Sequence, residues 1–165
     1  MTCDKKSYME YSSWNDAAEA AVQLINSEVR FKPRTDLVQL RTDFDEMVDE
    51  FFHTPSGSER MIARWSVVGA DAWELAIKKQ FDFSVKRLTK ILISKQRDYG
   101  SENIRRFGRQ GLCIRTHDKV ARLENLWDQE GIPQNESIED TLMDIIGYSA
   151  IGIMWESQRF LLPLK

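Results

Sequence analysis

Apolar residues recur every three or four positions through most of this chain, and that spacing constrains its fold more than any other feature. The clearest case lies between Asp36 and Phe52, where six apolar side chains share one face of a predicted helix: Leu37, Leu40, Phe44, Met47, Val48 and Phe51. A period near 3.6 residues is typical of an amphipathic α-helix. The sequence has no internal repeat, and residues 112–115 are its single weak strand candidate. We therefore predict an all-α protein.

Capping residues set the expected starts of the first two helices. Ser13 is a suitable N-cap, with Asp16 placed as its capping-box partner, for a helix that runs to about Val29. The Lys32-Pro33-Arg34 segment ends this pattern, and Thr35 or Asp36 then starts the second helix.

The remaining helices are predicted from longer patterns. From Glu59 to about Arg97 the spacing predicts one long helical stretch, bent near residues 69–71, with Gly100 as its left-handed C-cap. Residues 100–115, rich in Gly and Arg, are expected to form a connection. Two more helices are expected at about 116–129 and 136–159. We predict an N-terminal helical extension at 1–57 and a helical core at 58–165, which together form one compact unit.

Composition narrows the class of protein. With 165 residues and 42% hydrophobic content, the chain can form one domain with a substantial core. It has no apolar run of about 18 residues and no apolar signal segment, so we expect a cytoplasmic protein without a membrane partner. Cys3 and Cys113 form no C-x-x-C pair, so neither a disulfide nor a zinc site is expected.

The net charge of −3 hides an uneven distribution. Eleven Lys or Arg and only three acids lie between Lys86 and Arg122, which leaves that segment at +8 and the rest of the chain at −11. A basic centre in an acidic protein favours a phosphate-bearing ligand over a broad nucleic-acid surface, although nucleic acid is not excluded. For any one of these charges, a solvated helix face is the simpler interpretation.

Three acids at four-residue intervals, Glu136, Asp140 and Asp144, lie on one face of the last predicted helix. Four residues turn a helix by about 400°, so each acid lies only about 40° from the one before. Carboxylates placed this way repel one another unless they are neutralised. A divalent metal is the simplest neutraliser, and metals that bind phosphates favour oxygen ligands. The same line continues with Gly147 and Ile151, which indicates that the acids face a cleft or an interface.

Each acid also has a structural interpretation. Ser137 and Asp140 form a capping-box pattern, in which Asp140 would start the helix. Glu136 would then be a favourable charge at the positive end of the helix. Asp144 would pair with a basic residue of a neighbouring helix. Both interpretations remain open at the level of sequence.

The preceding helix carries a polar edge of Asp118, Arg122 and Asn125. Asp118 and Arg122 are four residues apart and can simply pair. Alternatively, Asp118 joins the metal ligands while Arg122 and Lys119 bind phosphate oxygens, a role that suits the guanidinium fork. Tyr99 either stacks on a base or packs over a helix end.

Three motifs in this order resemble the nucleotide-modification-associated domain family, found largely in phages and bacteria. They are K-x-x-D-Y-G from Lys95, R-x-x-D-K-x-x-R-x-x-N-L from Arg115, and E-S-x-x-D-T-x-x-D-x-x-x-Y from Glu136. The resemblance covers about residues 86–155. That family is similar to the MazG-like all-α nucleoside triphosphate pyrophosphohydrolases, which release pyrophosphate and the monophosphate.

The resemblance implies a helical bundle, often a homodimer, that holds Mg²⁺ through acids of two adjacent helices. The family's E-x-x-E element is missing, since no acid lies three residues from Asp118 on the earlier helix. Whether the chain is an enzyme is therefore left open. The resemblance assigns metal ligands (Asp118, Glu136, Asp140, Asp144), catalytic residues (Glu136, Asp144) and substrate-binding residues (Lys95, Tyr99, Arg115, Lys119, Arg122, Asn125).

We therefore expect Mg²⁺-dependent binding or pyrophosphohydrolysis of a nucleotide or deoxynucleotide. One alternative is a non-catalytic interaction protein, in which the same helical face contacts a dimer mate or a host partner. Another is a DNA-associated module that uses the basic segment 86–122.

Overall fold

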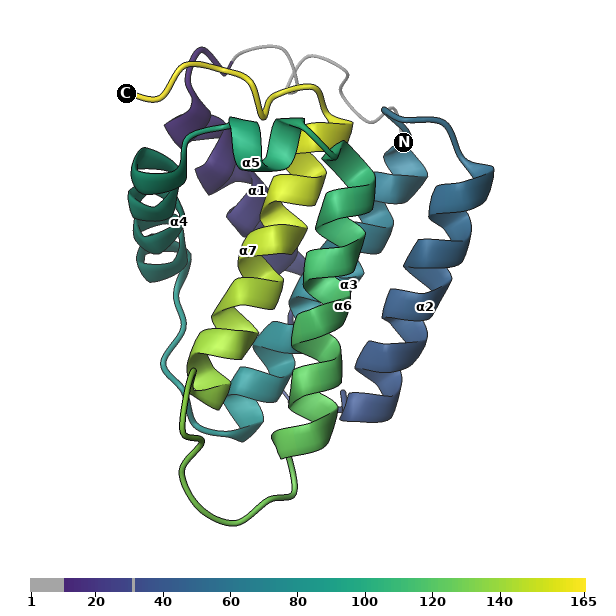
Figure 1. Cartoon of the computed structure of the whole chain (residues 1–165), viewed down its shortest axis with the longest axis vertical. Coiled ribbons are helices and arrows are strands. Elements are labelled where there is room, and N and C mark those ends of the chain that lie inside the picture. The colour runs from purple at the N-terminus through teal and green to yellow at the C-terminus, as the bar shows by residue number, and fades with distance from the viewer. Residues whose placement is uncertain (1–10, 31) are drawn as a thin grey trace.

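Seven α-helices and no strand make up the part of the chain that the computed structural model describes, residues 11–30 and 32–165 (Figure 1). This confirms the predicted all-α class. The helices are α1 (Trp14–Glu28), α2 (Leu37–His53), α3 (Glu59–Lys78), α4 (Val85–Tyr99), α5 (Glu102–Arg105), α6 (Gly108–Leu126) and α7 (Ile138–Glu156). No described helix combines the length and apolar character needed to cross a membrane.

Predicted caps are confirmed at the starts of α1 and α2 and at the end of α4. The Ser13 hydroxyl accepts the backbone N–H of Asp16 at 3.2 Å at the start of α1. At the start of α2, the Asp36 carboxylate accepts the N–H of Gln39 at 2.8 Å. Gly100 follows α4 with a φ of +65°, a conformation that glycine adopts without strain. The prediction for Cys3 lies outside the described residues, while Cys113 is a buried free thiol.

The predicted continuous helix from Glu59 to Arg97 is wrong, because α3 ends at Lys78 and α4 begins only at Val85. Gln80 has a left-handed φ of +62°, and the Phe81 N–H returns to the carbonyl of Ala76 at 2.9 Å. Ser84 then caps α4 by accepting the N–H of Arg87. The chain therefore reverses where the sequence contains neither Gly nor Pro.

The predicted connection at 100–115 is also wrong, since α5 and most of the first half of α6 occupy it. The strand candidate 112–115 lies within α6, whose register buries Leu112 and Thr116 on the same face. The predicted start of this helix at residue 116 was therefore about two turns late. A φ of +51° at Gly108 lets the chain turn directly from α5 into α6.

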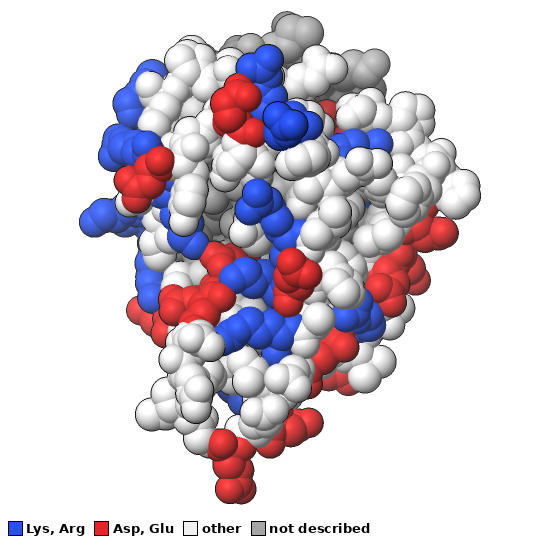
Figure 2. Space-filling model, viewed as in Figure 1, with Lys and Arg blue, Asp and Glu red and all other residues white. Residues whose placement is uncertain are grey.

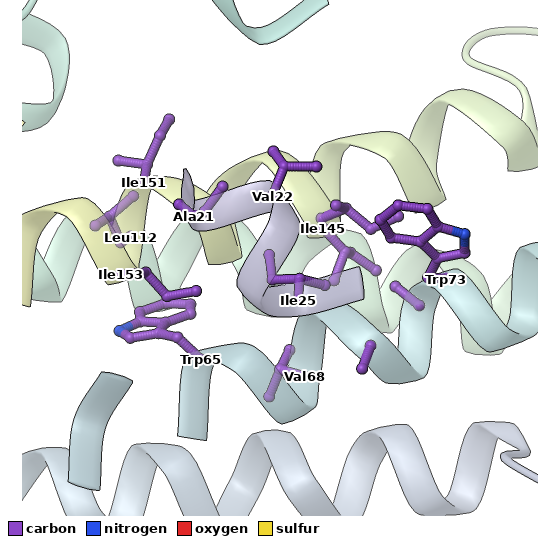
Figure 3. Close-up of a cluster of buried hydrophobic side chains, with 14 of the residues drawn as sticks. Ala21, Val22, Ile25, Trp65, Val68, Trp73, Leu112, Ile145, Ile151 and Ile153 are labelled. Atoms are coloured by element: carbon purple, nitrogen blue, oxygen red, sulfur yellow. The ribbon is translucent and has the colours of Figure 1, made fainter. Parts of the chain in front are cut away.

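The core is centred on the contact between α3 and α7. Trp65 and Trp73 of α3 are buried, and Figure 3 shows their rings beside isoleucines of α7. Gly152 permits this close approach, because a Cβ at that position would lie 2.4 Å from the Trp65 ring. Helix α1 packs against α3, α4 and α7, so Trp14 and Ile25 belong to the same hydrophobic cluster.

The outer helices differ in how firmly they are packed. α6 lies along α7, and α2 packs against α3 and α6. α4 packs mainly against α1 and makes few contacts with α7. Figure 1 shows α4 at the left edge of the molecule, set apart from α7 and α6. This arrangement positions the candidate site described next.

Candidate functional site

A cleft of about 290 Å³ lies between α4, α6 and α7 and is closed by α1 and α5. Its inner surface is apolar and includes Trp14, Val22, Leu88, Leu92, Ile104, Ile146 and Ile151. Polar side chains line much of the rest, among them Lys95, Tyr99, Arg115, Lys119, Asp144 and Tyr148. The structure therefore brings together four of the six predicted substrate-binding residues and one of the two predicted catalytic acids.

A chain of alternating charges connects the helices around this cleft. Lys95 Nζ lies 2.5 Å from Asp144 Oδ1, and Lys119 Nζ lies 2.8 Å from Asp144 Oδ2. Lys119 Nζ also lies 2.6 Å from Glu136 Oε2. Figure 2 shows mixed basic and acidic side chains gathered over this part of the surface. The structural interpretation of Asp144, a pair with a neighbouring helix, is thus confirmed, and it pairs with two lysines.

The two acids beside Lys119 have pKa values shifted in opposite directions. Burial raises the pKa of Glu136, and a hydrogen bond to Asp144 adds to this effect. Burial alone would raise the pKa of Asp144 too, but hydrogen bonds from Glu136, Lys119 and Lys95 outweigh it and lower that pKa. Glu136 is therefore the stronger base of the pair, whereas Asp144 is held in its ionised form by the hydrogen bonds that it accepts.

Arg115 is half-buried in the cleft and has no acidic partner among residues 11–30 and 32–165. Its guanidinium reaches the backbone carbonyl of Asn103 at 3.5 Å. Lys95 and Lys119 are both neutralised by carboxylates, so Arg115 is the cation of this cleft that is most available to an anionic ligand.

Two predicted substrate-binding residues lie outside the cleft. Arg122 donates to the Thr141 hydroxyl at 3.0 Å and to the backbone carbonyl of Glu136. It therefore fixes the start of α7 against α6. Asn125 is exposed near the end of α6, where its backbone carbonyl accepts a hydrogen bond from Gln129.

Two predicted metal ligands are also placed elsewhere. Asp118 is exposed, and the group nearest to it in an ion-pair arrangement is His117, at 4.0 Å. Asp140 begins α7: its N–H donates to the Ser137 hydroxyl at 3.0 Å, and that hydroxyl donates to its carboxylate at 2.8 Å. The capping interpretation of Asp140 is confirmed.

The register of α6 explains the position of Asp118. Thr116, Val120 and Leu123 are buried and define the inner face of this helix. Asp118 lies about 160° around the helix from Thr116, whereas Lys119 lies only about 60° from it. The inner edge of α6 thus carries a cation where the metal hypothesis expected an acid.

Glu136 and Asp144 are the carboxylates of this site that fit Mg²⁺, and they fit it as part of a complex with a phosphorylated ligand. Within the described ranges, no three His, Cys, Asp or Glu side chains are grouped to hold a metal ion. Glu136 and Asp144 are close together, but Lys119 lies against both. Mg²⁺ often uses one or two carboxylates together with substrate phosphates. These two acids therefore fit a Mg²⁺ that arrives with a phosphorylated ligand better than a metal held by the protein alone.

Two polar residues of the cleft were missed by the sequence analysis. Trp14 Nε1 and Asn103 Oδ1 are both buried without a hydrogen-bond partner, and both residues line the cleft. Neither belongs to a recognisable motif, and only the fold brings them together. Comparison of this chain with protein-family models, with curated proteins and with solved structures finds no match.

Proposed function

We propose that the cleft between α4, α6 and α7 binds a phosphorylated nucleoside. The observation that carries the proposal is the half-buried Arg115, which lines the cleft beside its apolar floor and has no acidic partner in the described chain. An arginine in this setting is suited to the bidentate binding of a phosphate. Lys95 and Lys119 lie in the same lining and supply further positive charge.

The nucleoside would occupy the inner part of the cleft. Tyr99 and Tyr148 offer rings for stacking, and the apolar floor suits the faces of a base. The unpartnered Trp14 N–H and Asn103 carbonyl oxygen are one donor and one acceptor that the edge of a base can satisfy. A volume of about 290 Å³ holds the base and sugar, with the phosphates at the basic rim.

The MazG-like resemblance supports Mg²⁺ and pyrophosphohydrolysis as the finer form of this proposal. Asp144 and Glu136 would hold Mg²⁺ together with the phosphates, and the ion would neutralise charge on the leaving pyrophosphate. Lys119 would then exchange its carboxylate contacts for phosphate oxygens. Asp144 or Glu136 would orient the water that attacks the α-phosphorus, and Glu136, whose pKa is raised, would be the stronger base of the two.

Calorimetric titration of a nucleotide panel, with and without Mg²⁺, tests the proposal. We expect at least one nucleotide to bind, with affinity falling by about tenfold or more in Arg115→Ala, equal to about 1.4 kcal/mol. Arg105→Ala is the matched control, because Arg105 is exposed, pairs with Glu102 and lies outside the cleft. Absence of binding across the panel, or equal losses in both variants, would reject the cleft as a nucleotide site. Release of pyrophosphate in the same samples tests hydrolysis separately.

A second candidate function, self-association, is supported by an apolar groove between α2 and α6. The groove measures about 480 Å³ and is lined by Phe44, Val48, Phe51, Phe52 and Ile114, among others. Phe52 and Ile114 are 71% and 64% exposed, which is unusual for side chains of this size within one groove. This face is the one we propose for a homodimer.

A further inference from the structure

A second cavity, separate from the cleft, lies where the end of α1 meets α2 and α3. It has a volume of about 230 Å³ and shares no lining residue with the cleft between α4, α6 and α7. Its acidic side chains include Asp43 of α2 and Asp71 and Glu74 of α3. Arg30 and Arg34, from the segment that joins α1 to α2, also line it.

The two acids of α3 are buried and incompletely paired. Asp71 is 5% exposed; its Oδ1 accepts the Thr35 hydroxyl at 3.3 Å, and its Oδ2 has no hydrogen-bond partner. Glu74 is 2% exposed, and its Oε1 also has no partner. Burial of an unpaired carboxylate oxygen is costly, so such groups are normally matched by donors. Two of them in one cavity indicate that a donor-bearing ligand completes the site.

The electrostatics of the cavity favour an ammonium group at its inner end. Burial raises the pKa of Asp71 to about 9, and the neighbouring carboxylates of Asp43 and Glu74 act in the same direction. A cation is the natural replacement for the proton that Asp71 then carries at neutral pH. A metal is disfavoured, because no three acidic, His or Cys side chains in the described chain are arranged to hold one.

The rim of the cavity has the opposite charge. Arg30 and Arg34 are exposed, and neither forms an ion pair with another described residue. Glu28 is the remaining charged side chain of the lining. A purely cationic ligand would meet these guanidinium groups unfavourably, whereas a carboxylate at its outer end would pair with them.

We propose that this cavity binds a small zwitterion, with its amine against Asp71 and Glu74 and its carboxylate at Arg30 and Arg34. The cavity volume of about 230 Å³ suits a ligand the size of a small amino acid. Asp71 releases its proton when the ammonium group binds. Affinity therefore increases as the pH rises from about 6 to about 8, while an alkylamine with a pKa near 10 stays protonated.

Three four-carbon probes separate the parts of this proposal: 4-aminobutanoate, 1-butylamine and butanoate. In calorimetry and thermal-shift measurements we expect 4-aminobutanoate to bind most tightly and butanoate least. Titrations in buffers of different ionisation enthalpy should show proton release. No binding of either amine at about 10 mM, which corresponds to a free energy of only about −2.7 kcal/mol, would overturn the proposal. Stabilisation by MgCl₂ alone would overturn it in favour of a metal site.

Variants at both ends of the cavity complete the test. Glu74→Gln should weaken 4-aminobutanoate binding by about tenfold or more, whereas Asp49→Asn, an exposed acid of α2 outside the cavity, should leave it unchanged. Arg34→Ala lies at an exposed position and should fold normally. It should abolish the preference for 4-aminobutanoate over 1-butylamine. An unchanged preference in Arg34→Ala would reject the zwitterion.

Discussion

Lys95 of α4 donates to the carboxylate of Asp144 on α7 at 2.5 Å, across 49 residues of sequence. The two helices make few other contacts, so this pair forms much of the direct connection between them. It also lines the proposed nucleotide cleft, where Lys95 is available to exchange a carboxylate for a phosphate. Its removal should therefore affect ligand binding more than folding.

Lys95→Met tests this expectation against Lys90→Met, which changes an exposed lysine of the same helix outside the cleft. The Lys95 side chain is 49% exposed, so its loss should lower the free energy of unfolding by only about 0.5–1 kcal/mol. Nucleotide affinity should fall by about tenfold, whereas Lys90→Met should change neither quantity. Urea denaturation and calorimetry measure the two effects. A large loss of stability with unchanged affinity would contradict the assignment.

Lys119→Met should be the more damaging substitution, because it leaves Glu136 and Asp144 together without the ammonium group between them. We expect the free energy of unfolding to fall by about 1–3 kcal/mol at pH 7, since uncompensated charges in a partly buried site are costly. Protonation of the acids should recover much of the loss at about pH 4. The double variant Lys119→Met/Glu136→Gln should also recover it. If it does not, repulsion between the two acids is not the cause.

Gly152→Ala should destabilise the protein by about 1–3 kcal/mol or more, because the new methyl group would overlap the Trp65 ring. Gly147→Ala is a matched control in the same helix, where a Cβ would lie 3.6 Å from Leu92 in ordinary contact. Helix propensity favours that control variant by about 0.5–1 kcal/mol. Thermal and urea unfolding of both variants check the prediction. Equal effects would mean that α3 and α7 are not as closely packed as described.

Asp71 should make stability decline with increasing pH. Its pKa is raised from 3.8 to about 9 in the folded protein, so between these values the native state binds more protons than the unfolded state. The contribution of Asp71 to the free energy of unfolding is complete below pH 3.8. It is lost as the pH rises towards 9, at no more than about 1.4 kcal/mol per pH unit. Asp71→Asn should flatten this decline. Urea midpoints of both proteins at about pH 5, 7 and 9 provide the measurement.

Phe52→Asp tests the proposed dimer face. If α2 and α6 form the interface, the native protein should show a concentration-dependent increase in molar mass by light scattering, and the variant should remain a monomer. Val38→Asp is a control, because Val38 is a comparably exposed apolar residue of α2 outside the groove. A monomeric native protein at all concentrations would reject this second candidate function.

Much of the fold could be predicted from the sequence, because its helices carry clear local signals. Ser13 caps α1 as predicted, and Asp36, one of the two residues predicted to start α2, caps that helix. Ser137 caps α7, as the capping-box interpretation of Asp140 expects. The break after Lys78 could not be predicted in this way. It depends on a left-handed φ at Gln80, a conformation that glutamine does not signal in a sequence.

The candidate site was predicted only in part, for a similar reason. The motifs contained Lys95, Arg115, Lys119 and Asp144, which the fold does bring together. Their pairing depends on the register of α6, which turns Lys119 inwards and Asp118 towards solvent. The helix was predicted to begin near residue 116, so the predicted element did not include the buried Leu112 and Cys113, which help define its inner face.

The close packing of α3 and α7 over Gly152 has a consequence for motion. Helices that approach so closely cannot slide past one another without displacing Trp65, so they act as a fixed frame. α4 shares few contacts with α7 and is held across the cleft by a pair that water or a competing anion can separate. We therefore expect α4 to move when the cleft opens. The ion pair between Lys95 and Asp144 would hold the cleft closed, and α4 would pivot about its contact with α1.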